Sequence, residues 1–359
     1  MNSSAPLSLV DLDLVLAQTR ELWEEMRGQR VFITGGTGFF GCWLVESFCH
    51  VNRVLALGAR ATVLTRDPAK FARKCPHLAG DPALTLHAGD VRDFEFPAGE
   101  FRFVIHAATE ASAKQAAEEP LEMLSTILAG TERALRFAAQ CGARKFLLTS
   151  SGAVYGRQPP ELTHVPESYA GAPDPLDASS VYAEGKRASE LMCALHQKAA
   201  VAKGIEFEAK IARCWAFCGP HLPLDAHFAI GNFIADVLAG RPISIAGDGT
   251  PRRSYLYAAD LAVWLWAILF RAPPLLAINV GSGRDVSILE LAECVSATLA
   301  PDTTASSIQI QVAQQAVPGA LPARYVPSVE RAEKLLGLRE TVGLEETIRR
   351  TAAWHGYAV

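Results

Sequence analysis

The stretch Val31-Phe-Ile-Thr-Gly35-Gly-Thr-Gly38-Phe-Phe-Gly41 decides how this chain is expected to fold. An apolar β-run leads into glycines spaced GxxGxxG, and a helical pattern follows. Glycine lets the backbone turn tightly, approach a pyrophosphate and pack the next helix on its strand. The N-terminus of that helix offers N–H groups and a positive dipole end to phosphates. The residues predicted to bind a dinucleotide here are Gly35, Thr37, Gly38, Phe39, Phe40 and Gly41.

Short β-branched runs alternate with Ala-rich helical stretches on both sides of this segment. The expected strands are Val31–Thr34, Ala61–Leu64, Leu84–His87, Phe103–His106, Lys145–Thr149 and Ala209–Ala212. The expected helices include Gly38–His50, Pro120–Cys141 and Val181–Ala202. This alternation predicts an α/β fold, a Rossmann-type doubly wound parallel sheet with helices on both faces.

Changes in the residue pattern along the chain predict three structural parts. Residues 1–27 are a polar N-terminal helical extension, and residues 28–213 form the Rossmann NAD(P)-binding domain, to which later segments return. After Cys214 the alternation loosens, and Pro and Gly interrupt the chain in HLPLD, AGRP and GDGTPRR. Residues 214–359 are therefore expected to form a smaller α/β C-terminal substrate domain.

Composition excludes several classes of protein. The 359 residues are 50% apolar and carry 34 Lys and Arg against 38 Asp and Glu, so no basic excess favours nucleic acid. The longest apolar run, Leu261–Phe270, has about half of the ~20 residues that a membrane span needs. The N-terminus lacks a basic signal-peptide region, and eight cysteines without a CxxC pair fit a reducing compartment. A cytoplasmic protein with neither nucleic acid nor membrane as partner is expected.

The end of the second strand, Val63-Leu-Thr65-Arg66-Asp67, bears on cofactor choice. A carboxylate facing the adenosine ribose would favour NAD, whereas a guanidinium binds a 2′-phosphate with two parallel hydrogen bonds. Arg66 holds the expected ribose-facing position, so NADP is favoured over NAD. A shift of one residue would put Asp67 there and restore an NAD-type site.

Two further strands end in small or polar residues at the same edge of the sheet, in His87-Ala-Gly-Asp90-Val91 and Val104-Ile-His106-Ala107-Ala108-Thr109. The carboxyl ends of parallel strands line the crevice in which a dinucleotide binds. His106 lies among apolar residues and is interpreted as structural rather than as a base. The residues expected to contact the cofactor are Asp90, Val91, Ala107, Ala108 and Thr109.

The segments Tyr182-Ala-Glu-Gly-Lys186 and Thr149-Ser150-Ser151 are the catalytic candidates. Residues i and i+4 share a helix face, so Tyr182 and Lys186 would point together into the crevice and also contact the cofactor. A phenol with a pKa near 10 is a poor base. A neighbouring ammonium and the positive nicotinamide would favour its phenolate. A serine hydroxyl at the strand end can orient the substrate oxygen.

The spacing of Cys214, Cys218 and His221 is compatible with metal ligands, but no fourth ligand accompanies it. Zinc sites use three or four well-placed ligands. No metal site is predicted.

With these residues in view, the chain resembles an extended short-chain dehydrogenase/reductase of the nucleotide-sugar epimerase/dehydratase group, from roughly Arg30 to Trp354. The motifs that carry the resemblance are TGGTGFFG, GDVRD, HAAT, SSGAVYG, YAEGK, GDGTPRRSY, NVGSG and RAEKLLGL. The resemblance implies a nucleotide-sugar substrate and a homodimer formed through a four-helix bundle of the helices at Pro120–Cys141 and Val181–Ala202.

The same resemblance assigns roles to single residues. Ser151, rather than Ser150, is the hydroxyl beside the sugar C4 oxygen, and Tyr182 is the acid/base. Lys186 lowers the pKa of Tyr182 and holds the nicotinamide ribose. For the substrate, Arg253 grips the nucleotide diphosphate and Asn232 contacts the nucleotide end.

Several residues depart from the family pattern, and these departures reduce the number of reactions that the chain is expected to catalyse. Gly152 and Ala153 stand where sugar 4,6-dehydratases have acidic residues, and UDP-glucuronate decarboxylases, which YAEGKRASELMCALH resembles, have a glutamate at Ala153. Ala216 and Ile127 stand where many relatives have asparagines. A 4-epimerase or 4-ketoreductase acting by hydride transfer at sugar C4 is therefore favoured. The alternatives are a UDP-glucuronate-type decarboxylase or 4,6-dehydratase, an NADPH-dependent reductase of a non-sugar carbonyl, and a non-catalytic redox-sensing module.

Overall fold

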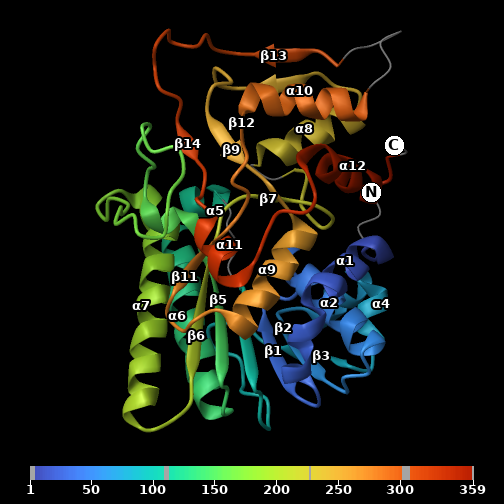
Figure 1. Cartoon of the computed structure of the whole chain (residues 1–359), viewed down its shortest axis with the longest axis vertical. Coiled ribbons are helices and arrows are strands. Elements are labelled where there is room, and N and C mark those ends of the chain that lie inside the picture. Colours follow the sequence, from blue (N-terminus) through green and yellow to red (C-terminus); the bar gives the residue numbers. More distant parts are fainter. Residues whose placement is uncertain (1–4, 109–112, 226–227, 301–307, 358–359) are drawn as a thin grey trace.

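A central parallel sheet organises the chain (Figure 1). This computed structural model describes residues 5–108, 113–225, 228–300 and 308–357. The strands of the sheet are β1 Arg30–Thr34, β2 Arg60–Thr65, β3 Leu84–Ala88, β4 Phe103–His106, β5 Lys145–Ser151, β6 Glu208–Cys214 and β11 Ala277–Val280. Their order is β11-β6-β5-β4-β1-β2-β3, and every neighbouring pair is parallel. The predicted Rossmann-type fold is confirmed.

The strand order reverses between β1 and β4, which decides where a ligand can bind. The chain runs outward from β1 through β2 to β3, then returns to place β4 on the other side of β1. Ile33 of β1 pairs with Val63 on one side and Ile105 on the other, so the ends of β1 and β4 lie level. In doubly wound sheets the binding crevice opens at this reversal.

The six strands expected from the sequence all occur, and the structure adds a seventh. Strand β11 pairs with β6 at the edge of the sheet, with Ala277 opposite Ile211. It has only four residues, and the sequence around it lacks the βα alternation that marks the other strands. Strand β11 joins the sheet because the chain returns to β6 after it has already formed several elements of the smaller C-terminal region.

Helices cover both faces of the sheet, as two-sided burial of parallel strands requires. One face is covered by α6 Pro120–Gln140 and α7 Val181–Ala202, which also pack on each other. The other face is covered by α2 Phe39–Val54 and α9 Ala258–Arg271. Every residue of α9 from Ala258 to Phe270 is buried. No helix in the described part of the chain is long and apolar enough to cross a membrane.

The N-terminal segment packs against α9 and α2 as helix α1 Leu9–Thr19 and the 3-10 turn η1 Arg20–Met26. Buried Asp11 accepts hydrogen bonds from the Tyr257 hydroxyl at 2.9 Å and from Arg350 Nη1 at 2.7 Å. Trp23 lies 4.6 Å from Trp266, ring centre to ring centre. The N-terminal segment is thus held in the core by contacts with residues of the C-terminal part of the chain.

The remaining elements form the smaller C-terminal region and the loops around the sheet. The smaller region, at the top of Figure 1, contains β7 Phe217–Cys218, α8 Ala229–Leu238, β8 Ile243–Ile245, β9 Arg252–Ser254, β10 Leu256–Tyr257, β12 Asp285–Ser287, α10 Ile288–Leu299, β13 Ile310–Val312, β14 Arg324–Tyr325 and α12 Leu344–Trp354. The rest are α3 Pro68–Lys74, α4 Pro76–Ala79, α5 Ala113–Glu118, η2 Gly152–Tyr155, η3 Ala178–Ser180 and α11 Glu330–Leu336. The smaller region has its own apolar core, built on α8, α10 and α12.

Candidate active site

The turn between β1 and α2 brings backbone against backbone. Gly35 has a φ of +71°, and a Cβ added there would lie 2.4 Å from the carbonyl carbon of Ala107 at the end of β4. A Cβ on Gly41 would lie 2.2 Å from the Gly35 carbonyl oxygen. Only glycine fits at either position, because any side chain would push β1, α2 and β4 apart. The turn forms a cradle that leaves the α2 N-terminus open to phosphates.

A cleft of about 1710 Å³ lies between the carboxyl ends of the strands and the smaller region. The sequence-predicted residues that line it are Gly35, Thr37, Gly38, Phe39, Phe40, Arg66, Asp90, Val91, Ala107, Ala108, Ser151, Tyr182, Lys186, Asn232 and Arg253. Gly41 lies behind the turn instead of on the wall. Thr109 lies outside the described residues. The structure thus brings together residues from opposite ends of the chain.

Arg66 and Asp67 differ in what they face. Arg66 is exposed and lines the cleft beyond the end of β2. The Asp67 carboxylate caps α3 by accepting a hydrogen bond from the Lys70 backbone N–H at 2.8 Å. A carboxylate used in this way is turned to the start of a helix. Of these two residues, Arg66 is therefore the one available to a ribose or a ribose phosphate.

Asp90 occupies the same end of the cleft. Arg92 Nε donates a hydrogen bond to Asp90 Oδ1 at 2.8 Å and holds the pKa of that carboxyl below its usual value, with a smaller contribution from the Arg66 charge. Arg92 also forms an ion pair with Glu122 on α6. These contacts keep Asp90 ionised and fixed beside Val91.

Ser151, Tyr182 and Lys186 meet where β5 ends against the start of α7. Ser151 lies near the Tyr182 phenol, and hydrogen bonding from its hydroxyl favours the phenolate and acts to lower the pKa of Tyr182. Lys186 Nζ donates to the Thr149 carbonyl oxygen at 2.9 Å and lies 5.8 Å from the centre of the Tyr182 ring. The neighbouring Ser150 hydroxyl donates instead to Glu190 at 2.6 Å. The Ser150 hydroxyl is thus engaged with α7 at Glu190, whereas Ser151 lines the cleft beside Tyr182.

Burial dominates the electrostatics of these groups. It raises the pKa of Tyr182 to about 12, while the Ser151 hydrogen bond opposes that shift. Burial also lowers the pKa of Lys186 to about 8. In the protein alone, desolvation thus keeps the phenol protonated at neutral pH, and the opposing contribution comes from Ser151, whereas a lowering by Lys186 was expected. A further positive charge is needed to favour the phenolate.

His106 has the surroundings of a structural histidine. Its Nδ1 lies 2.8 Å from Thr34 Oγ1 and its Nε2 lies 3.2 Å from Thr131 Oγ1. Burial, with the nearby Lys186 charge, lowers the pKa of His106 to about 3. A neutral imidazole with both nitrogens engaged agrees with the sequence interpretation.

Two aromatic residues that the sequence analysis did not select complete the reaction end of the cleft. Tyr325 lies near Ser151, whose hydroxyl acts to lower the pKa that burial raises, and its ring lies 4.4 Å from that of Trp215. A Cβ on Gly152 would meet the Trp215 ring at 2.6 Å and the Tyr325 hydroxyl at 2.9 Å. These rings therefore occupy the space in front of Gly152. No local motif could have found Tyr325, because it reaches the site through strand pairing opposite Arg253.

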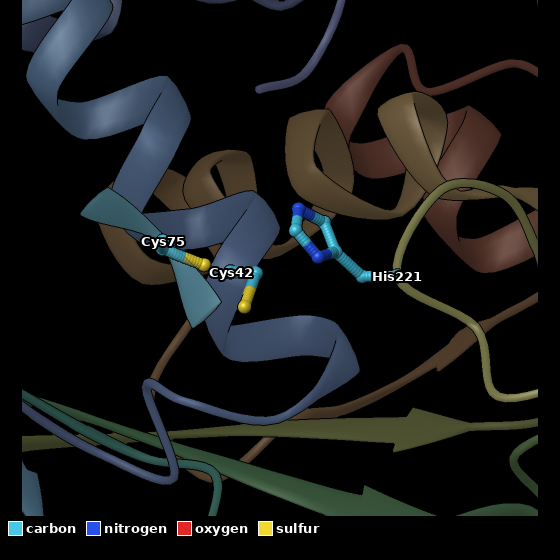
Figure 2. A group of neighbouring side chains, drawn as sticks. All are labelled: Cys42, Cys75 and His221. Carbon is cyan, nitrogen blue, oxygen red and sulfur yellow. The ribbon is translucent and has the colours of Figure 1, made fainter. Parts of the chain in front are cut away.

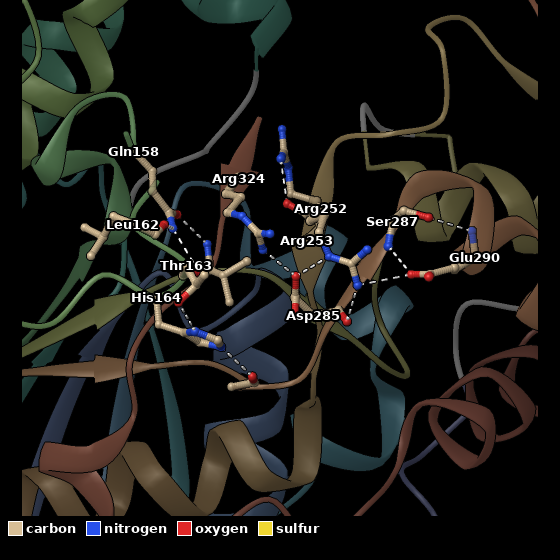
Figure 3. Close-up of polar contacts among 12 residues, drawn as sticks. Gln158, Leu162, Thr163, His164, Arg252, Arg253, Asp285, Ser287, Glu290 and Arg324 are labelled. Atoms are coloured by element: carbon tan, nitrogen blue, oxygen red, sulfur yellow. Dashed lines mark hydrogen bonds and ion pairs between the residues drawn. The ribbon is translucent and has the colours of Figure 1, made fainter. Parts of the chain in front are cut away.

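An arginine cluster borders the substrate end of the cleft (Figure 3). Arg252 and Arg324 both form ion pairs with Asp285. Arg253 lines the cleft, and its Nη1 donates to the Arg252 carbonyl oxygen at 2.9 Å. Asn232 lines the cleft from α8. Arg252 also pairs with Glu290 at 3.2 Å, so two carboxylates balance Arg252 and Arg324. Arg253 then leaves this edge with an excess positive charge, which suits binding of a diphosphate.

His221 is separated from the cysteines with which its sequence spacing associates it. Cys218 contacts the Thr351 hydroxyl at 3.3 Å, and Cys214 lines the cleft. His221 instead lies close to Cys42 and Cys75.

The fold and site define a Rossmann-type enzyme that uses a dinucleotide. The family model described as "NAD dependent epimerase/dehydratase family" matches residues 31–281. UDP-glucuronic acid decarboxylase 2 of Arabidopsis thaliana is 30% identical over 324 residues, which are 89% of this chain and 66% of that protein. The chain thus spans slightly less than two thirds of this relative. The chain belongs to the NAD-dependent epimerase/dehydratase family.

Solved structures agree in fold. A NAD-dependent NDP-hexosamine 5,6-dehydratase of tunicamycin biosynthesis has a TM-score of 0.72 and 25% identity, covering 91% of this chain and 97% of its own. A UDP-N-acetylglucosamine 4-epimerase from Methanobrevibacter ruminantium has a TM-score of 0.74 and 21% identity, covering 91% and 98%. The second likeness concerns the fold alone.

The pKa of Tyr182 provides the first prediction. Burial disfavours the phenolate of Tyr182. The difference in phenolate absorbance between the wild type and the Tyr182→Phe variant should therefore titrate only near pH 12. Saturating oxidised cofactor adds a positive charge near the phenol and should lower that pKa by about 1–3 units. Reduced cofactor, which lacks the nicotinamide charge, is the control and should leave the pKa nearly unchanged. The account would be contradicted if the titration curve were the same without cofactor, with oxidised cofactor and with reduced cofactor.

Proposed function

We propose that this enzyme transfers hydride reversibly at C4 of a nucleotide-linked sugar, as a 4-epimerase or a 4-ketoreductase. The observation that carries the proposal is a pair of facing hydroxyls, Ser151 and Tyr182, beside two positions without acid–base groups, Gly152 and Ala153. Such a pair can manage one hydroxyl proton. Elimination needs further groups to take and give protons at other carbons.

The residues present fit an NAD(P) cofactor. The glycine cradle that any Cβ would fill lies at the α2 N-terminus, beside Arg66 and Asp90. In the bound complex, Gly35 and Gly38 would approach the pyrophosphate, while Tyr182 and Lys186 would lie beside the nicotinamide ribose. When bound, the cofactor accepts or returns the hydride of the sugar carbon. The chain supplies binding, orientation and proton handling.

Tyr182 and Ser151 divide the proton chemistry. The Ser151 hydroxyl orients the sugar oxygen by hydrogen bonding, and Tyr182 Oη takes the hydroxyl proton during oxidation and returns it during reduction. Lys186, held by the Thr149 carbonyl oxygen, keeps a positive charge below the phenol. The positive edge at Arg253 and the amide of Asn232 would bind the diphosphate and the nucleotide end.

A UDP-glucuronate-type decarboxylase is the second candidate, because curated relatives of that name align over about nine tenths of this chain. Loss of carbon dioxide from a 4-keto acid requires less acid–base help than elimination does. Ala153 weakens this reading, since those relatives are expected to have a glutamate there. Burial raises the pKa of Tyr325, so its hydroxyl offers a hydrogen-bond donor but no base.

We further propose a preference for NADP, supported by the different surroundings of Arg66 and Asp67. Arg66 faces the cleft, and Asp67 is engaged as the cap of α3. A guanidinium can pair bidentately with a ribose 2′-phosphate, whereas no such gain exists with an unphosphorylated ribose.

A homodimer formed through α6 and α7 is also proposed. In the single chain, these helices expose Leu121, Leu191 and Leu195, with 82%, 60% and 56% of their surface accessible. Leu191 and Leu195 are one helical turn apart on α7 and so share a face. Packing α6 and α7 against their symmetry mates would bury these leucines in a four-helix bundle.

Cofactor preference is tested by replacing Arg66. Losing a charge-assisted hydrogen bond of about 1.5–3 kcal/mol should weaken NADPH binding by Arg66→Ser about 10- to 100-fold, with little change for NADH. Lys70→Ser, at an exposed position on α3 away from the cleft, is the control. Dissociation constants from fluorescence titration give the comparison. Equal weakening of both cofactors would refute a 2′-phosphate role.

The reaction itself is tested with UDP-glucose, UDP-N-acetylglucosamine and UDP-glucuronate in deuterated water. The proposal predicts a C4 epimer, or a C4 alcohol formed from a 4-keto sugar with NADPH, without deuterium at C5 and without carbon dioxide. Tyr182→Phe should lower the rate about 10²- to 10⁴-fold. Carbon dioxide released from UDP-glucuronate would establish the decarboxylase instead, and deuterium at C5 with loss of water would establish a dehydratase.

The two favoured reactions differ in how they use cofactor. Denaturing the purified enzyme and identifying released nucleotides by mass spectrometry distinguishes them. Retained oxidised cofactor indicates an epimerase, which regenerates it in each cycle, and NAD in that sample would overturn the NADP preference. An empty protein that binds NADPH more tightly than NADH indicates a ketoreductase.

Oligomeric state is tested at the exposed leucines. Light scattering of the wild type at micromolar concentration should give twice the chain mass. Leu191→Glu combined with Leu195→Glu should give the monomer, because two carboxylates would have to be buried in the bundle. Leu335→Glu, equally exposed but on α11, should leave the dimer intact. A monomeric wild type would refute the proposal.

A further inference from the structure

Cys42, Cys75 and His221 come together behind the glycine turn, although they are far apart in the sequence (Figure 2). Cys42 lies in the first turns of α2, Cys75 at the junction of α3 and α4, and His221 in the loop after β7. The two sulfur atoms and a ring nitrogen lie within 4.8 Å of one another, and all three residues are buried. None of the three lines the cleft.

The two nitrogens of His221 have different surroundings. Nε2 lies 2.9 Å from Glu46 Oε1, whereas Nδ1 is buried without a hydrogen-bond partner among the described residues. The His221 side chain has no accessible surface, so water does not reach this nitrogen from bulk solvent. In Figure 2 the imidazole lies with its edge toward the thiols. A buried nitrogen without a partner is costly unless something binds it.

We propose that Cys42, Cys75 and His221 bind a soft divalent metal ion, with Zn²⁺ as the best fit. Two thiolates and one imidazole are a donor set that zinc prefers, and a water molecule enclosed together with the ion would take the fourth position. Tetrahedral zinc, with bonds of about 2.3 Å to sulfur, keeps its ligand atoms roughly 3.5–3.8 Å apart. Side-chain rotation would therefore have to draw the ligand atoms together by at most about 1 Å.

The surroundings of the imidazole match those of known metal-ligating histidines. Such histidines usually donate their second ring N–H to a carboxylate, which orients the ring and raises its basicity. Glu46 is that carboxylate, held by hydrogen bonds from His221, His77 and the Leu7 backbone N–H. Burial alone would raise the pKa of Glu46, but these hydrogen bonds keep it below the usual value.

The charges around the cluster also accommodate the ion. Binding releases two thiol protons to solvent and adds one divalent cation, so the net charge of the buried cluster does not change. The groups that face it are Glu46, His77 and Lys74, whose Nζ donates to the Thr37 carbonyl oxygen at 3.0 Å and lies 3.8 Å from Cys42 Sγ. The Cys42 thiol donates to the Thr37 carbonyl oxygen, with 3.7 Å between sulfur and oxygen.

The ion would have a structural role. It would join the start of α2, the segment that follows Arg66, and the loop that leads from β7 into the smaller region. These three segments border the cofactor cradle and the substrate side of the cleft. Metal binding should therefore stabilise the protein and tighten dinucleotide binding, without contact with the reacting atoms.

The test is metal binding by the tag-free full chain under reducing conditions, after chelator treatment. Titration with Co²⁺ should reach about one equivalent, with thiolate-to-cobalt charge-transfer absorption, and Zn²⁺ should displace it. Zn²⁺ should also raise the Tm. Because this readout needs no substrate or cofactor, it stands or falls independently of the proposed reaction.

Variants locate the ion. Cys75→Ser should weaken Co²⁺ binding at least about 100-fold, and Glu46→Gln about 10- to 100-fold. Cys49→Ser, a buried thiol on α2 outside the cluster, should keep wild-type binding and is the matched control. The proposal would be overturned if the wild type bound neither Co²⁺ nor Zn²⁺ under reducing conditions. Co²⁺ binding without thiolate charge-transfer absorption would also overturn it. Both outcomes are measured on the wild type, so they do not depend on whether a variant folds.

Discussion

The structure depends on one close contact, between the backbone of the glycine turn after β1 and the end of β4. Gly35 and Gly41 leave no room for a side chain, because an added Cβ would lie 2.2–2.4 Å from neighbouring backbone atoms. This contact brings the α2 N-terminus down to the point where the strand order reverses. The cleft opens at this reversal, and the glycine turn forms part of its wall together with Arg66 and Asp90.

Burial is the second constraint, and it acts on proton chemistry. The same packing that excludes water raises the pKa of Tyr182 to about 12 and lowers that of Lys186 to about 8. The phenol is therefore protonated in the protein alone, and under the proposed function it would act as a base only after oxidised cofactor places a positive charge beside it. Binding of oxidised cofactor and readiness to accept a substrate proton are thus coupled by electrostatics.

Short apolar runs that alternate with helical stretches were sufficient to predict the sheet strands up to β6 and the helices α2, α6 and α7. Strand β11 was not predicted, although it is as long as β4, because the sequence around it lacks that alternation. Most candidate site residues were found because they lie in short motifs at strand ends. Trp215 and Tyr325 were not found, because strand pairing, rather than a motif, brings Tyr325 to Ser151.

The sequence by itself determined the class of fold, the cofactor cradle and the Ser151–Tyr182–Lys186 group, because glycine spacing, strand ends and the i, i+4 helix rule are local properties. Only the tertiary structure decided which residues fill the space before Gly152, how Arg66 and Asp67 divide their roles, and that His221 meets Cys42 and Cys75. These juxtapositions join segments tens to hundreds of residues apart. Their distances depend on how helices and strands pack, which no local pattern specifies.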